Sequence, residues 1–141
     1  MVQFAQLELS PARSMHPVHA ICLAGTFPLF LGALLSDWTY AASYEIQWTN
    51  FASWLIAGAL VFCGISLLFA VIDVVRTRGR GLFYALILFA VFLLGLINAL
   101  EHAKDGWAAM PAALILSVIV TALCLLAVWA GFSTLRRGEA K

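Results

Sequence analysis

Residues 51–72 read FASWLIAGALVFCGISLLFAVI, a run without a single charged side chain. At a rise of 1.5 Å per residue, a helix of this length crosses the ~30 Å hydrocarbon layer of a bilayer. Over the whole chain of 141 residues, 64% are apolar and only 11% are charged, whereas about a quarter are charged in a typical soluble domain. This excess of apolar residues predicts that part of the chain faces lipid.

Three further stretches resemble this one, and none of the four holds a lysine or an arginine in its interior. The predicted spans cover about 17–36, 51–72, 82–101 and 112–132. The breaks between them are short, which is typical of an antiparallel up-down bundle, and the alternating segments of a β-barrel are not seen. We therefore expect an all-α integral membrane protein, an antiparallel up-down four-helix transmembrane bundle that forms a single domain over residues 1–141.

The basic residues predict the orientation of the bundle. Seven of the eight lysines and arginines fall on one side of the predicted spans, and only Lys104 falls on the other. Because basic segments stay in the cytoplasm, both termini and the loop that holds Arg76, Arg78 and Arg80 are predicted to be cytoplasmic. The connection Asp37–Asn50 is rich in aromatic residues, and we expect it to form a short lid along the outer surface.

Small residues four positions apart let helices approach closely in lipid, and each predicted span carries such a set. We expect helix contacts at Gly32/Ser36, Ser53/Ala57, Gly95/Ala99, Ala113/Ser117/Thr121 and Ala127/Gly131.

His16 and His19 lie at the predicted inner end of the first span, on roughly one helix face. Asp73 is expected at the same depth, where an Asp–His pair across helices would be favourable in a low dielectric. Two interpretations stay open. The group binds a ligand such as haem b or relays protons, or it is an interfacial helix start whose polar groups bond to headgroups, to carbonyls or to Arg76.

A second polar group is predicted at the outer surface. Asn98, Glu101, His102 and Asp105 recur at spacings of three and four, so they share one face as the third span leaves the membrane. That face can meet Asp37 at the end of the first span. A carboxylate-rich site with one histidine can hold a divalent cation or move protons, and the alternative is a helix end that becomes wet and polar.

The positions of the histidines limit a haem. A bis-histidine b-type haem needs two imidazoles on opposite faces of one iron, whereas His16 and His19 share a helix face. His102 lies at the other membrane surface, on the order of 30 Å away. A haem would therefore need a symmetric dimer, a methionine ligand such as Met110, or another subunit.

Several motifs together resemble those of a known family. They are His16-Pro17-Val18-His19, Phe27-Pro28, Ser36-Asp37-Trp38, Ala52-Ser53-Trp54-Leu55, Ile97-Asn98-Ala99-Leu100-Glu101-His102 and Gly131-Phe132-Ser133. The chain resembles, over nearly its whole length, a bacterial family of small four-span membrane proteins catalogued as domain-of-unknown-function family 2231. The resemblance implies an inner-membrane protein without an established activity. The fusion of some relatives to Rieske-type iron–sulfur domains implies electron transfer nearby, and this sequence contains no such domain.

Three functions are compatible with these observations. The first is a structural or accessory subunit without its own catalysis, since no P-loop, dinucleotide-binding, GxSxG or HExxH pattern is present. The second is a redox subunit that binds haem b or quinone near the cytoplasmic face through His16, His19 and Asp73. The third is a small proton or cation transporter that uses both polar groups, with Ser117 and Thr121 between them.

The expected surroundings follow from the same features. The lipid bilayer of the bacterial inner membrane is the predicted location, and a homodimer or a larger membrane complex is compatible with all three functions. A net charge of +1 argues against nucleic acid as a partner. We do not expect an enzyme.

Overall fold

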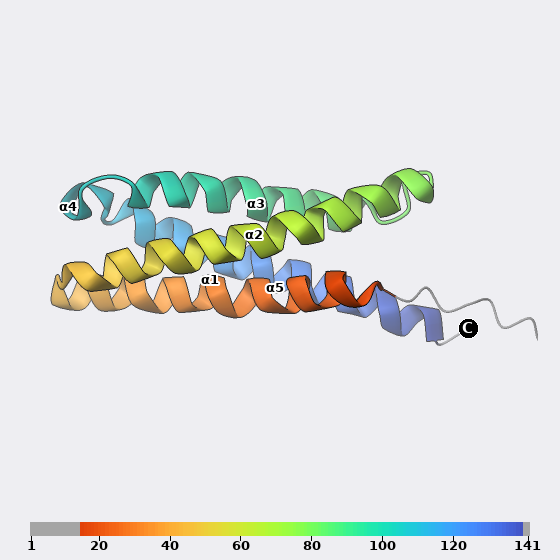
Figure 1. The fold of residues 1–141 in the computed structure, drawn as a ribbon, viewed down its shortest axis with the longest axis horizontal. Coiled ribbons are helices and arrows are strands. Elements are labelled where there is room, and N and C mark those ends of the chain that lie inside the picture. Colours follow the sequence, from red (N-terminus) through yellow and green to blue (C-terminus); the bar gives the residue numbers. More distant parts are fainter. Residues whose placement is uncertain (1–14, 140–141) are drawn as a thin grey trace, which may run out of the picture.

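The computed structural model describes residues 15–139, which form helices joined by short turns (Figure 1). Four helices are long: α1 (Pro17–Ser43), α2 (Ile46–Arg76), α3 (Leu82–His102) and α5 (Ala112–Glu139). A single turn of helix, α4 (Gly106–Ala109), lies between α3 and α5. No strand occurs within the described range. The all-α prediction is therefore confirmed.

Each of the four long helices contains a segment that is long and apolar enough to cross a membrane. Large apolar side chains such as Leu68, Leu86 and Leu126 are exposed on the outside of the bundle, where lipid would contact them. The prediction of four membrane-spanning helices is confirmed by these segments. The cytoplasmic placement of both termini stays a prediction.

The long helices form a four-sided bundle. α1 packs against α2 and α5, and α3 packs against the same two helices, so α1 and α3 face each other across the bundle axis. Because consecutive helices run in opposite directions, α1 and α3 are parallel (Figure 1). The core between the helices is mostly apolar, and the side chains that are at most 1% exposed include those of Leu23, Phe30, Leu88, Val91 and Val120.

Glycine brings α3 and α5 close to their neighbours. A Cβ atom at Gly95 would lie 2.9 Å from the ring of Phe30, and one at Gly131 would lie 2.5 Å from a methyl carbon of Leu23. The predicted small-residue contacts are confirmed at these two glycines. The prediction is wrong at Ala57, which is exposed, because the buried stripe of α2 passes through Ala52, Ile56, Ala59 and Cys63.

The predicted lid over Asp37–Asn50 is wrong. α1 continues to Ser43 and α2 begins at Ile46, so the connection is only two residues long. The hydroxyls of Thr39 and Ser43 donate to carbonyls four residues earlier, at 2.8 and 2.7 Å, which satisfies these polar side chains within the helix. Tyr44 then ends α1 in the left-handed region, at φ 59°. Asp37 consequently lies inside a helix rather than at its end.

The two ends of the bundle differ in composition. We name the end that holds Tyr40, Tyr44 and Trp107 the aromatic end, and it is the predicted outer end. We name the end that holds His16 and the Arg76–Arg80 turn the arginine end, and it is the predicted cytoplasmic end.

Candidate functional site

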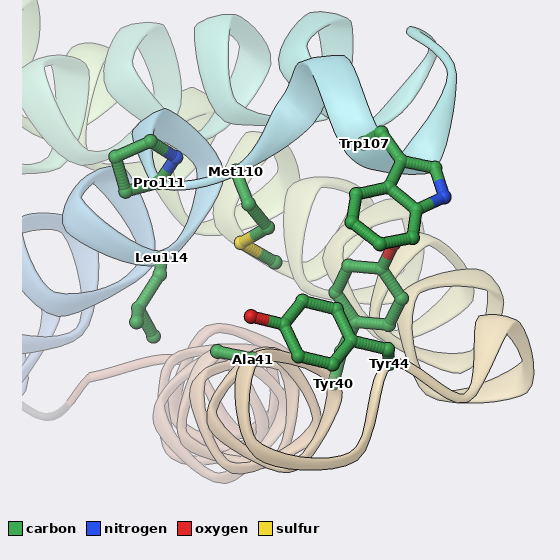
Figure 2. Close-up of a pocket in the computed structure, with 7 residues that line it drawn as sticks. All are labelled: Tyr40, Ala41, Tyr44, Trp107, Met110, Pro111 and Leu114. Carbon is green, nitrogen blue, oxygen red and sulfur yellow. The ribbon is translucent and has the colours of Figure 1, made fainter.

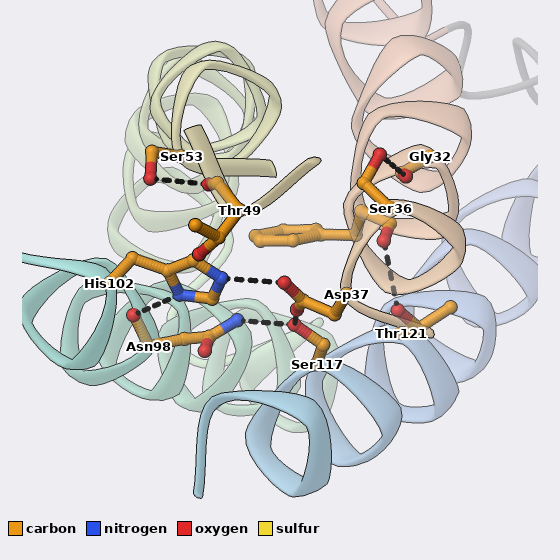
Figure 3. Close-up of polar contacts among 10 residues, drawn as sticks. Gly32, Ser36, Asp37, Thr49, Ser53, Asn98, His102, Ser117 and Thr121 are labelled. Carbon is orange, nitrogen blue, oxygen red and sulfur yellow. Dashed lines mark hydrogen bonds and ion pairs between the residues drawn. The ribbon is translucent and has the colours of Figure 1, made fainter. Parts of the chain in front are cut away.

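Asp37 lies inside the bundle near the aromatic end and is 0% exposed. Its two carboxylate oxygens are held by side chains from two other helices (Figure 3). Oδ1 lies 2.8 Å from Nε2 of His102 on α3. Oδ2 accepts a hydrogen bond of 2.5 Å from the hydroxyl of Ser117 on α5. Each oxygen of the buried Asp37 carboxyl group therefore has a hydrogen-bond partner.

The hydrogen bonds of His102 fix the number of protons on the pair. Nδ1 lies 2.9 Å from the backbone carbonyl oxygen of Asn98, which can only accept, so Nδ1 carries a hydrogen. Nε2 and the Asp37 oxygen can then bond only if a further proton lies between them. The pair is either an imidazolium with a carboxylate or a neutral imidazole with a carboxylic acid. In both forms it has no net charge.

Asn98 closes these contacts into a ring. Its Nδ2 donates to the Ser117 oxygen at 2.8 Å, so the hydrogen of Ser117 is directed to Asp37. Its backbone carbonyl accepts from His102. The ring therefore joins α1, α3 and α5, and each bond in it has a defined direction except the one that shares the proton (Figure 3).

One acceptor of this ring is left open. The side-chain oxygen Oδ1 of Asn98 is buried and has no hydrogen-bond partner among the described residues. An unpaired buried acceptor costs on the order of 1–3 kcal/mol. A proton donor that enters the ring can therefore bind to Asn98 without breaking any existing bond.

The other members of the predicted outer group lie elsewhere. Glu101 binds Lys104 with both carboxylate oxygens at 2.7 Å, and 52% of the Lys104 side chain is exposed. Asp105 is exposed and precedes α4. The structure thus brings together Asp37, Asn98 and His102 and leaves Glu101 and Asp105 on the surface.

The arginine end holds a simpler contact. His19 is buried, and its Nε2 forms a hydrogen bond of 3.0 Å with the hydroxyl of Tyr84 on α3. His16 is exposed, and its Nδ1 caps α1 by accepting from the backbone N–H of Val18. Both imidazoles stack on the ring of Phe69, with centroids 5.4 Å apart in each case.

These contacts bear on the predicted ligand site at the arginine end. Two imidazoles that stack on the same ring of Phe69 do not face each other across a metal, so they do not suit a bis-histidine haem within one chain. Asp73 is exposed in the last turns of α2, and its pairing with a histidine stays a prediction. Within the described range, no group of three or more His, Cys, Asp or Glu residues could hold a metal ion.

The family described as predicted membrane protein (DUF2231) matches residues 15–138. The chain belongs to the DUF2231 family. The resemblance seen in the sequence motifs is thereby confirmed. No curated protein and no solved structure matches the chain.

Two contact residues of this DUF2231 chain were missed as site residues by sequence reasoning. Tyr84, which binds His19, lies near the start of the predicted span 82–101, and Phe69 lies inside the apolar run 51–72. Tyr84 and His102 both lie 65 residues after their partners, His19 and Asp37. That common offset is a signal that the sequence contains, but only the structure shows which residues it joins.

Proposed function

We propose that this DUF2231 protein is a small proton carrier of the membrane, and that the Asp37–His102 pair is its proton-binding group. The observation that carries the proposal is the ring around Asp37, in which two buried titratable groups lie 2.8 Å apart and need one shared proton to form a hydrogen bond. The side chains of His102 and Asp37 are 1% and 0% exposed. A buried ionisable residue in a membrane helix is costly and commonly has a role in moving ions or protons.

A purely structural role explains this ring less well. Replacing a buried ion pair by apolar side chains of similar volume is often neutral or stabilising, so such a pair is weak evidence for stability. A bundle that needed only cohesion would be served by the apolar contacts that fill the rest of its core. The retention of two titratable groups, oriented by Ser117 and Asn98, supports proton exchange instead.

The ring suggests how exchange would change the bundle. When the shared proton leaves, the neutral imidazole of His102 keeps one ring hydrogen for two acceptors, the Asn98 carbonyl and the Asp37 carboxylate, so one of its two hydrogen bonds is lost. Ser117 still donates to the other oxygen of Asp37 and stabilises the remaining negative charge. Proton release would therefore break one bond of the ring, either the contact of His102 with Asp37 on α1 or its contact with Asn98 within α3, and proton uptake would restore it.

Proton flux into proteoliposomes tests this proposal. A pH-sensitive dye inside the vesicles, with the membrane potential clamped, should report a flux above that of empty liposomes. Asp37→Asn and His102→Gln should each lower it by about tenfold or more, whereas the matched surface variant Glu101→Gln should leave it unchanged. A wild-type flux equal to that of empty liposomes, or an undiminished flux in Asp37→Asn, would overturn the proposal.

A second candidate function rests on a different observation. Between the two polar ends the core is mostly filled by apolar side chains, including Leu23, Phe30 and Leu88, and such an interior favours an accessory subunit that conducts nothing. Under this alternative the wild-type protein gives no flux, and it migrates with a larger complex on native gels of solubilised membranes. Measuring both properties on one preparation distinguishes the two functions.

A further inference from the structure

A pocket of about 350 Å³ opens at the aromatic end, between α1 and the segment that joins α4 to α5 (Figure 2). It lies one helical turn beyond the Asp37 ring, since Tyr40 follows Asp37 by three residues on α1 and Leu114 precedes Ser117 by three on α5. Its main walls are Tyr40, Tyr44, Trp107, Met110 and Leu114. The proton-binding proposal makes no use of this space.

Tyr40 supplies the only hydroxyl of the pocket that comes from a buried residue. The residue is 2% exposed, and the structure assigns its hydroxyl no hydrogen bond with any residue of the described range. In Figure 2 this hydroxyl points into the pocket, toward Met110 and Leu114. Because this hydroxyl faces the pocket and has no partner within the described range, a ligand oxygen can form a hydrogen bond with it without breaking a bond of the fold.

The rest of the lining favours a flat, apolar group. Tyr44 and Trp107 stack on each other with centroids 5.3 Å apart and an angle of 12° between their rings. Tyr40 meets Tyr44 edge-on, with centroids 6.4 Å apart. Aromatic rings prefer such stacked and edge-on neighbours, and the thioether of Met110 is a favourable contact for a ring as well.

The volume sets the size of the ligand. An apolar cavity of about 150 Å³ is enough for benzene in a protein core, so this pocket accommodates one aromatic ring with substituents. Its position at the predicted membrane surface makes it accessible to molecules dissolved in the bilayer.

We propose that this pocket binds a lipid-soluble molecule with a single aromatic or quinonoid ring and a hydrogen-bonding oxygen, and that the oxygen binds the hydroxyl of Tyr40. The ring lies against Tyr44, Trp107 and Met110. Binding does not depend on proton exchange at Asp37, so this site is an addition to the proposed function.

Two probes that differ by one hydroxyl test the site. The protein is reconstituted into lipid nanodiscs, and 4-fluorophenol and fluorobenzene are titrated in separate samples while their fluorine NMR signals are followed, with empty nanodiscs as the blank. The phenol should bind at least fivefold more tightly than fluorobenzene. Equal affinities would overturn the proposal, because the pocket would then be a groove for any apolar molecule, including lipid chains.

Variants locate the binding. Tyr40→Phe removes only the hydroxyl and should abolish the preference for the phenol, while Tyr84→Phe, which removes a tyrosine hydroxyl at the arginine end, should retain it. Leu114→Trp fills the pocket and should block both probes, which gives a second test if one variant folds poorly. Asp37→Asn should bind the phenol like the wild type even if proton flux is lost. An unchanged phenol preference in Tyr40→Phe would contradict the proposal.

Discussion

The aromatic end and the arginine end of the bundle both join α1 to α3 through a histidine, yet they do so in different ways. At the arginine end, His19 and Tyr84 form one hydrogen bond beside an apolar ring. At the aromatic end, His102 and Asp37 belong to a ring of bonds that recruits α5 as well. We expect the loss of the first contact to have the smaller consequence, because the loss of Asp37 removes the partner of two buried groups, His102 and Ser117. The comparison shows that the same residue type can form a single hydrogen bond or belong to a buried ring of hydrogen bonds, depending on its neighbours.

The largest expected effect is at Asp37. Asp37→Ala removes the partner of both His102 and Ser117 inside the bundle, and it should lower the free energy of unfolding by about 3 kcal/mol. Unfolding by sodium dodecyl sulfate, followed by circular dichroism in mixed micelles, measures the change. Asp105→Ala, an exposed carboxylate at the same end, is the control and should be nearly neutral. If the two variants unfold alike, the aromatic end does not depend on its ring.

A smaller effect is expected from crowding the arginine half of the bundle. A Cβ at Gly131 would lie 2.5 Å from Leu23 and 3.1 Å from the Tyr84 ring, so Gly131→Ala should destabilise the protein by about 2 kcal/mol. Gly58→Ala is the matched control, because its new Cβ would meet only Leu29, at an ordinary 3.7 Å. The same unfolding assay compares them. A Gly131→Ala protein as stable as Gly58→Ala would mean that α5 can move away from α1 at little cost.

Removing the hydrogen bond at the arginine end should lower the free energy of unfolding by a still smaller amount. Tyr84→Phe keeps the ring and deletes the hydroxyl that binds His19, which should cost about 1 kcal/mol. Tyr44→Phe, at an exposed tyrosine of the other end, serves as its control in the unfolding assay. A loss as large as that of Asp37→Ala would contradict the contrast between the two ends.

The smallest effect is expected on the surface. Glu101→Gln weakens the ion pair with Lys104, whose side chain is 52% exposed, and should change the free energy of unfolding by about 0.5 kcal/mol or less. Raising the salt concentration should reduce even this difference. A loss of more than 1 kcal/mol would place Glu101 in the buried ring after all.

The sequence was sufficient for the four spans, because membrane helices must satisfy their backbone groups internally and face lipid with apolar side chains. The spacing of Asn98 and His102 likewise indicated a common face, which follows from helix geometry alone. Glu101 shares that spacing but pairs with Lys104, since the exact rotation of α3 decides which of its polar side chains face the bundle interior. That rotation is set by packing and is not encoded in the spacing.

Two further features could not be predicted from the sequence. The polar and aromatic composition of Asp37–Asn50 suggested a loop, but hydroxyl groups bonded to helix carbonyls let α1 continue to Ser43. Tyr40 and Trp38 look alike in the sequence as interfacial aromatics, yet Tyr40 is 2% exposed and Trp38 is 67% exposed. Only the position of the neighbouring helices distinguishes the residue that lines a pocket from the one that faces lipid.

The equal offset of 65 residues in the two α1–α3 contacts has a consequence for the length of these helices. His19 and Asp37 are 18 residues apart on α1, as are Tyr84 and His102 on α3, and 18 residues are five full turns of an α-helix. The two contacts are therefore separated by the same length, and by the same whole number of turns, on both parallel helices. Inserting one residue into either helix between its contacts would rotate one end by about 100° and shift it by about 1.5 Å, so that only one of the two contacts could form at a time.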